Sequence, residues 1–186
     1  MGGRARASLI VTLVVSGCAG GAAPADQPLS GGAPLVVTDM DGARHDLDAA
    51  LERGGTVGLV FWQTWCESCA QEAPRLAEAA REHQGRIAFL GVVPGRDDLV
   101  DAGEVRAVAR RWGYGFPQVR DPDLVLSRRL GVEGTPTIVV LGRGREVLYR
   151  GHRPPPEWAP YLGAPAADPT PGADGCADGV CPLPGE

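Results

Sequence analysis

The stretch TVGLVFW, at residues 56–62, is the feature that most constrains how this 186-residue chain can fold. An uninterrupted apolar run of this length is typical of a β-strand that is buried on both faces. A second such run, RIAFLGVV, follows at residues 86–93. A strand buried on both faces needs helices on both sides of its sheet, so the two runs predict an α/β domain.

Helical patterns lie between and after these strands. Residues 66–83 have helical spacing, and Asp101 can cap a helix over residues 102–112 that Gly113 ends. A further short helix is predicted within residues 121–131. Its sequence is DPDLVLSRRLG, in which the last glycine stops the helix.

Two β-hairpins complete the predicted fold. The first, at residues 34–47, turns at an Asp-Gly pair typical of tight turns. The second, at residues 135–151, turns around the sequence RGR. The β-α-β units and the final hairpin together predict a mixed central sheet with helices on both faces, preceded by an N-terminal β-hairpin. We place this domain at residues 35–162.

Residues 1–17 have the pattern of an export signal. Two arginines precede an apolar stretch at residues 7–15, which is shorter than the about 20 residues that a membrane span needs. The stretch ends in VSGC at residues 15–18, which resembles the lipobox of bacterial lipoproteins. That resemblance implies a lipid on Cys18, which would anchor the protein to a lipid bilayer of the bacterial cell envelope. An ordinary secretory signal with a chance cysteine is the alternative.

Segments rich in proline, glycine and alanine flank the domain. We predict a flexible tether at residues 18–34 and a tail without fixed structure at residues 163–186. Outside the cytosol, paired thiols tend to become disulfides. With Cys18 assigned to lipid, the other four cysteines form two close pairs. We expect the disulfides Cys66–Cys69 and Cys176–Cys181; for the tail pair, a local bridge, a shuttle that exchanges with Cys66 and metal capture all remain open.

Charge excludes some classes of function. The chain has 23 acidic and 18 basic residues, for a net charge of −5, and every basic residue is arginine. An acidic chain without a basic cluster argues against nucleic acid as a partner. The absence of lysine excludes Schiff-base chemistry. The sequence predicts no cofactor.

The pair Cys66 and Cys69 favours redox chemistry over a metal site or a structural bridge. Zinc needs further ligands, and the histidines His45, His83 and His152 are scattered. A disulfide that closes so short a loop stabilises a fold little. At the start of a helix, unpaired N–H groups and the helix dipole favour a thiolate and lower the pKa of a thiol. We therefore expect an exposed Cys66 to attack a partner and a buried Cys69 to resolve the mixed disulfide.

The sequence WCESC, followed by Pro74 and by Thr135-Pro136, resembles thioredoxin-fold oxidoreductases. The resemblance covers residues 33–153 and is strongest to the TlpA/ResA type of the bacterial envelope. It implies disulfide exchange with envelope proteins that carry thiols or disulfides, such as apocytochrome c, and a thiol protein as electron donor or acceptor. It also implies that Pro136 is cis and faces the disulfide, while Thr135 offers backbone hydrogen bonds to a bound peptide.

Two further side chains are candidates for the site. Glu72 lies three residues after Cys69 on the same helix face, and the resemblance implies that it lies near the active site. Its carboxylate could take the proton from Cys69, although a solvated helix acid is the alternative. Trp65 is expected to shield the disulfide and to contact substrate. Val60 stands where cytosolic thioredoxins have a buried aspartate.

Two other functions remain open. Peroxiredoxin-like antioxidants share the fold and the N-terminal hairpin, but they carry a Pro-x3-Thr-x2-Cys motif, in which Leu59 and Gln63 replace the first two residues here. Copper or metallocentre assembly proteins of the Sco kind use a CxxxC pair with a distal histidine. Only His152 is a plausible distal ligand in this chain.

Overall fold

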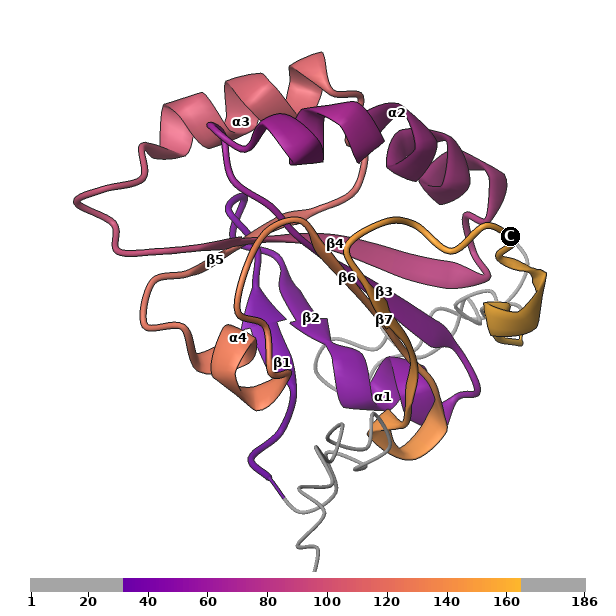
Figure 1. The fold of residues 1–186 in the computed structure, drawn as a ribbon. Helices are drawn as coiled ribbons and strands as arrows, with labels where there is room; N and C mark the ends of the chain where they lie inside the picture. Colours follow the sequence, from indigo (N-terminus) through magenta and orange to yellow (C-terminus); the bar gives the residue numbers. More distant parts are fainter. Residues whose placement is uncertain (1–31, 165–186) are drawn as a thin grey trace, which may run out of the picture.

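A five-stranded mixed sheet forms the centre of the computed structural model, which describes residues 32–164 (Figure 1). In sheet order, the strands are β5 (Gln118–Asp121), β4 (Ile87–Pro94), β3 (Thr56–Phe61), β6 (Thr137–Leu141) and β7 (Val147–Gly151). Strands β3, β4 and β5 are parallel, whereas β6 and β7 are antiparallel to their neighbours. The predicted mixed α/β sheet is confirmed.

Helices cover both faces of the sheet (Figure 1). One face carries α2 (Glu67–Glu82) and α3 (Ala102–Arg111). The other carries α1 (Leu47–Glu52), α4 (Val125–Arg129) and the hairpin of β1 (Val36–Thr38) and β2 (Arg44–Asp46). Two short 3-10 helices, η1 (Arg143–Arg145) and η2 (Ala159–Tyr161), complete the described chain.

Strand β3 lies in the middle of the core. All six of its residues are buried, as the apolar run predicts. Val60 points into the apolar cluster under α2 and α3, which also contains Cys66 and Cys69. Leu59 and Phe61 point into the second cluster, under α1 and α4. Cys66 and Cys69 therefore belong to the face of the sheet that α2 and α3 cover.

The predicted cap of α3 and the predicted short helix α4 are both present. Asp101 accepts a hydrogen bond from the backbone N–H of Glu104 at 2.7 Å, which satisfies one of the free donors of that helix end. Helix α4 was predicted within residues 121–131. It begins only at Val125, because the preceding Leu124 is in the left-handed region with φ of 54°.

Two elements were not predicted from the sequence. Helix α1 follows the first hairpin directly, where Asp46 accepts from the backbone N–H of Ala49 at 3.0 Å and so caps the helix. Strand β5 has only four residues, half of them charged, and it lacks the apolar run that marks β3 and β4. Helix α1 has only six residues and strand β5 only four, so neither is long enough to show a clear periodic pattern in the sequence.

An ion pair ties the first hairpin and α1 to the turn between β6 and β7. Both guanidinium nitrogens Nε and Nη2 of Arg145 donate to Asp48, at 2.6 and 2.7 Å. The backbone N–H of Leu35 donates to the same carboxylate at 2.8 Å. The hydrogen bonds from Arg145 lower the pKa of Asp48 below its usual value.

Replacing Asp48 with Asn should lower the free energy of unfolding at neutral pH by about 1.5–3 kcal/mol, because charged hydrogen bonds are lost. A carboxyl group whose folded pKa is lowered stabilises the fold above its unfolded pKa of about 3.9 and loses that contribution as the pH falls through the folded value. The difference between variant and parent should therefore shrink below about pH 4. Urea unfolding at several pH values measures the difference in the free energy of unfolding, and Asp123→Asn at an exposed position is the control. A difference that does not change with pH would contradict the prediction.

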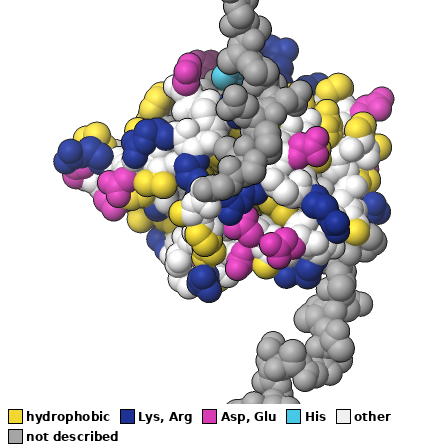
Figure 2. All heavy atoms as spheres, turned by 90° about the horizontal axis from the view of Figure 1, so that it is seen from below, with side chains coloured by type: hydrophobic (Ala, Val, Ile, Leu, Met, Phe, Trp, Pro, Cys, Tyr) yellow, Lys and Arg dark blue, Asp and Glu magenta, His cyan; other side chains and the backbone are white. Residues whose placement is uncertain are grey.

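The surface on the α1 and α4 side mixes both signs of charge. Figure 2 shows arginine and acidic side chains interspersed over this face, without a broad basic area among the atoms in view. Within residues 32–164, no helix is both long enough and apolar enough to cross a bilayer. The predicted signal, Cys18, most of the tether and the Cys176/Cys181 pair lie outside the described residues.

Candidate active site

A disulfide joins Cys66 to Cys69 across the first turn of α2, with the two Cα atoms 5.2 Å apart. Cys66 is the capping residue of the helix and has an extended backbone, with φ of −80° and ψ of 105°. Its Sγ accepts the backbone N–H of Cys69 at 3.1 Å and lies 3.5 Å from the hydroxyl of Ser68. We interpret Cys66 as the attacking cysteine. Its Sγ lies beside one N–H group and one hydroxyl group, and these donors favour a negative charge on the sulfur.

Burial of the two cysteines differs from expectation in one respect. Cys69 is fully buried, as expected, but Cys66 is only 5% exposed rather than open to solvent. The neighbouring Trp65 is 77% exposed and is the most prominent apolar side chain near the disulfide. A partner that reaches Cys66 would therefore also meet Trp65.

Trp62, which follows β3 directly, anchors the start of the loop that leads to α2. Its backbone N–H donates to the carbonyl of Val92 at 3.0 Å, which continues the pairing of β3 with β4. Its indole Nε1 donates to Oε1 of Gln118 at 2.9 Å, and the Gln118 amide donates in turn to the carbonyl of Phe116 at 2.8 Å. The ring of Trp62 is itself buried. The hydrogen-bonded chain from Trp62 through Gln118 to Phe116 therefore fixes the residue that precedes the loop to α2.

The cis peptide bond between Thr135 and Pro136 lies at the same edge of the sheet. Phe61 pairs with Thr137, so the residue before Thr137 lies beside the start of the loop that leads to Cys66. His152 holds this turn in place, since its Nδ1 donates to the carbonyl of Pro136 at 2.8 Å. The sheet register thus brings Thr135 and Pro136, about 70 residues away in sequence, to the edge that carries the disulfide.

Glu72 is mostly buried, with 15% of its side chain exposed, and it faces two arginines. Nη1 of Arg75 lies 3.9 Å from its Oε2, and Nε of Arg153 lies 3.7 Å from its Oε1. Within the described part of the chain, Oε2 has no hydrogen-bond partner. A buried carboxylate oxygen with a free lone pair, one turn from Cys69, is available to take a proton.

Tyr114 is a residue of this region that the sequence did not indicate. Its ring packs against Trp62 and Phe116, and its hydroxyl is buried without a hydrogen-bond partner among residues 32–164. Burial, and secondarily the charge of Glu72, raises the pKa of Tyr114 above its usual value. No local sequence pattern identifies Tyr114, because Trp62 and Glu72 come close to it only in the folded chain.

The structure also locates the residues on which the two alternative functions depend. Leu59 is buried in β3, and Gln63 donates its side-chain amide to the carbonyl of Pro94. The distal histidine candidate, His152, bonds to the turn at Pro136 through Nδ1. Over residues 32–164 there is no group of three or more His, Cys, Asp or Glu side chains placed to hold a metal ion.

Comparison with protein families identifies the domain. A family model described as the AhpC/TSA family matches residues 32–150. The chain belongs to the AhpC/TSA family. Among curated proteins, this AhpC/TSA domain is 32% identical over 114 residues to the thiol-disulfide oxidoreductase ResA of Geobacillus thermodenitrificans. The alignment covers 61% of this chain and 62% of ResA, so the chain matches about three fifths of that relative's length.

Solved structures similar to the AhpC/TSA domain share its thioredoxin-like fold. One is a secreted disulfide oxidoreductase of Mycobacterium tuberculosis homologous to E. coli DsbE, with 26% identity and a TM-score of 0.54, covering 65% of this chain and 84% of that one. Another is an exposed lipoprotein thioredoxin of Streptococcus pneumoniae, with 25% identity and a TM-score of 0.54, covering 64% and 88%. The recognition of a thioredoxin-fold family from the sequence is confirmed.

Proposed function

We propose that this protein is an extracytoplasmic thiol–disulfide oxidoreductase that exchanges disulfides with protein partners. The observation that carries the proposal is the disulfide between Cys66 and Cys69, which begins α2 at the edge shared with the cis Pro136. A bridge over so few residues adds little stability, whereas its sulfur at a helix start suits exchange. The names of the ResA relative and of the secreted mycobacterial oxidoreductase support both the activity and the location.

The exchange begins on the reduced protein. The thiolate of Cys66, stabilised by the N–H of Cys69 and the hydroxyl of Ser68, attacks a disulfide of the partner and forms a mixed disulfide. The thiol of Cys69 then gives up its proton and attacks Cys66, which closes the bridge and releases the partner with two thiols. The reverse sequence oxidises a partner dithiol.

Recognition of the partner falls to residues around the disulfide. The exposed Trp65 offers apolar area next to Cys66, and the half-buried Thr135 presents its backbone beside Pro136. An extended peptide segment could pair with that backbone while its cysteine lies over the disulfide. Envelope proteins that carry thiols or disulfides, such as apocytochrome c, have the required chemistry.

The location rests on the sequence before the domain. The signal pattern of residues 1–17 and the lipobox-like VSGC support export and a lipid on Cys18. A lipidated Cys18 would hold the domain at a bilayer of the envelope through residues 18–34. The similarity to an exposed lipoprotein of Streptococcus pneumoniae agrees with this placement.

Trapping of partners tests the proposed function. In a chain with Cys69→Ser, and with both tail cysteines also changed to Ser so that they cannot compete, Cys66 should stay disulfide-linked to its partners in the envelope. Mass spectrometry of the linked species identifies them, and the same chain with Cys66→Ser is the control. A folded trap variant that captures no more protein than this control would contradict the proposal.

Replacing Glu72 with Gln should slow resolution of the mixed disulfide about a hundredfold or more, because the acceptor for the Cys69 proton is lost. The loss should diminish as the pH rises and Cys69 ionises without help. Stopped-flow decay of a mixed disulfide with a small aromatic thiol measures the step. The exposed Glu104→Gln serves as control; an equal rate at every pH would assign Glu72 to a solvated structural role.

A further inference from the structure

His152 is an exposed residue that reaches the turn at Pro136 from the end of the last strand. Ile138 of β6 pairs with Gly151 of β7, so the next two residues toward the active-site edge, Thr137 and His152, face each other. Nδ1 of His152 lies 2.8 Å from the carbonyl oxygen of Pro136 and 3.5 Å from the hydroxyl of Thr137. A carbonyl oxygen can only accept, so Nδ1 carries the proton in this contact.

The polar groups on both sides of Thr135 are held by hydrogen bonds. The hydroxyl of Thr137 donates to the carbonyl of Gly134 at 2.7 Å, on the N-terminal side of Thr135. His152 holds the carbonyl of Pro136 on the other side. Within residues 32–164, the backbone N–H and carbonyl of Thr135 have no hydrogen-bond partner. Thr135 therefore has a fixed backbone whose own polar groups are open to a bound peptide.

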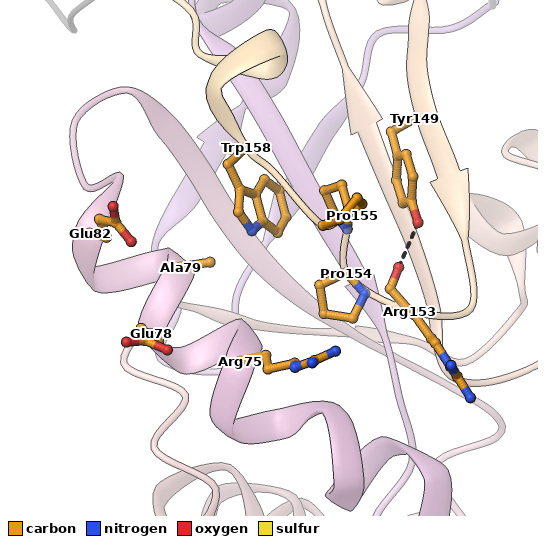
Figure 3. Close-up of a pocket in the computed structure, with 10 residues that line it drawn as sticks. Arg75, Glu78, Ala79, Glu82, Tyr149, Arg153, Pro154, Pro155 and Trp158 are labelled. Atoms are coloured by element: carbon orange, nitrogen blue, oxygen red, sulfur yellow. Dashed lines mark hydrogen bonds between the residues drawn. The ribbon is translucent and has the colours of Figure 1, made fainter.

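The residue after His152 contacts the other half of the site. Nε of Arg153 lies 3.7 Å from Oε1 of Glu72, the mostly buried carboxylate one turn from Cys69. The hydroxyl of Tyr149 holds the backbone at this point by donating to the carbonyl of Arg153 at 2.8 Å (Figure 3). Two neighbouring residues after β7 thus contact the turn beside the disulfide and the proposed proton acceptor.

The segment that carries His152 is stiff. Prolines occupy positions 154–156. Proline fixes its own φ and restricts the residue before it, here Arg153, to extended backbone. Pro154 and Pro155 are buried and stand across a groove of about 600 Å³ from α2 (Figure 3). The imidazole of His152 is therefore presented from a fixed backbone, although it is exposed.

We infer that His152 is a positioning residue, which holds the backbone of Thr135 and Pro136 in the conformation that pairs with an extended peptide and so favours peptide disulfides over small disulfides. The inference deepens the proposed function and rests on it, since it needs a reactive Cys66 and a peptide beside Thr135. His152 acts through the turn and not on the sulfurs, so its loss should weaken peptide binding and leave the chemistry at Cys66 unchanged.

Preorganisation is the physical basis of this effect. A turn that is held before the peptide arrives does not have to be ordered during binding, and this raises affinity without any new contact. Without the donor at Nδ1, the carbonyl of Pro136 loses its partner, and the peptide unit can turn toward solvent. The bound peptide would then have to order the turn itself. A disulfide without a peptide backbone does not pair with Thr135 and should not sense the change.

Single-turnover oxidation of the reduced protein tests the inference. The full chain, with both tail cysteines changed to Ser, is mixed with excess disulfide, and tryptophan fluorescence follows closure of the bridge between Cys66 and Cys69. One substrate is a peptide with an internal disulfide, and the other is hydroxyethyl disulfide, which has no peptide backbone. The half-saturating concentration reports binding, and the limiting rate reports the chemical step.

His152→Ala should raise the half-saturating concentration of the peptide about three- to tenfold, as expected for one lost hydrogen bond, with the limiting rate changed by less than about twofold. Its rate with hydroxyethyl disulfide should equal that of the parent chain. His152→Asn is the matched control, because its amide nitrogen can take the place of Nδ1 and should restore peptide binding. Urea unfolding checks that both variants are folded.

Equal losses with the two disulfides would overturn the inference, because His152 would then support the whole region around Cys66. Peptide binding that is unchanged in His152→Ala, or that is as weak in His152→Asn as in His152→Ala, would also overturn it. In either case a parent chain that reacts rapidly with hydroxyethyl disulfide leaves the proposed function standing. A parent chain that reacts with this disulfide no faster than free cysteine would overturn both.

Discussion

Replacing Cys66 with Ser should lower the rate of disulfide exchange by a factor of about 10³ or more, because the attacking nucleophile is lost. The fold should be retained, since serine is smaller and its oxygen can still accept the N–H of Cys69 at the helix start. Reduction of insulin disulfides in the presence of dithiothreitol measures the rate, and circular dichroism checks the fold.

Cys69→Ser, with both tail cysteines also changed to Ser, is the matched variant, assayed with a disulfide substrate and without dithiothreitol. It leaves the first attack intact, so it should consume one equivalent of a disulfide substrate quickly and then stop as a mixed disulfide. This result would identify Cys66 as the attacking cysteine and Cys69 as the resolving one. Equal activity of Cys66→Ser and the parent chain would mean that exchange does not pass through α2 at all.

Replacing Gly91 with Ala should lower the free energy of unfolding by about 2–5 kcal/mol, through overpacking and the loss of buried hydrogen bonds. Gly91 lies in β4 opposite Gln118. A Cβ atom there would come within 2.0 Å of the Gln118 Oε1 and 2.9 Å of the Trp62 Nε1. The side chain of Gln118 would have to leave Trp62, and the buried indole N–H would lose its acceptor.

Denaturant unfolding measures this effect, and Gly115→Ala provides the control. Gly115 is exposed, and a Cβ atom there would contact nothing within 4 Å. That change should leave the stability unaltered or raise it by about 0.4–1 kcal/mol through the unfolded chain. Because Trp62 anchors the start of the loop that leads to Cys66, Gly91→Ala should also lower exchange activity. A Gly91→Ala protein of unchanged stability would show that the Gln118 side chain can adopt another conformation at no cost, and would contradict the prediction.

The sequence predicted those parts of the fold that local pattern decides. The apolar runs at residues 56–62 and 86–93 correspond to β3 and β4, and the cap at Asp101 is where α3 begins. These elements carry strong signals because each is long or has a capping side chain. The CxxC pair and its place at the start of a helix follow from the same kind of pattern.

What the sequence did not reveal depends on contacts between distant segments. Strand β5 forms because it pairs with β4, and the exact start of the predicted short helix α4 is set by the left-handed Leu124. The burial of Cys66 likewise depends on packing that no local pattern contains. The arginine that faces Glu72 from beyond β7, Arg153, is 81 residues away, and only the finished sheet brings it near.

The start of the described chain lies on the side of the sheet that does not carry the disulfide. Leu35 is buried with the residues of α1 and α4, and the carbonyl of Ala33 accepts from Arg129 in α4. Immobilising the protein on a solid support, or fusing a carrier to it, ahead of this point would therefore keep the WCESC edge clear for a large substrate.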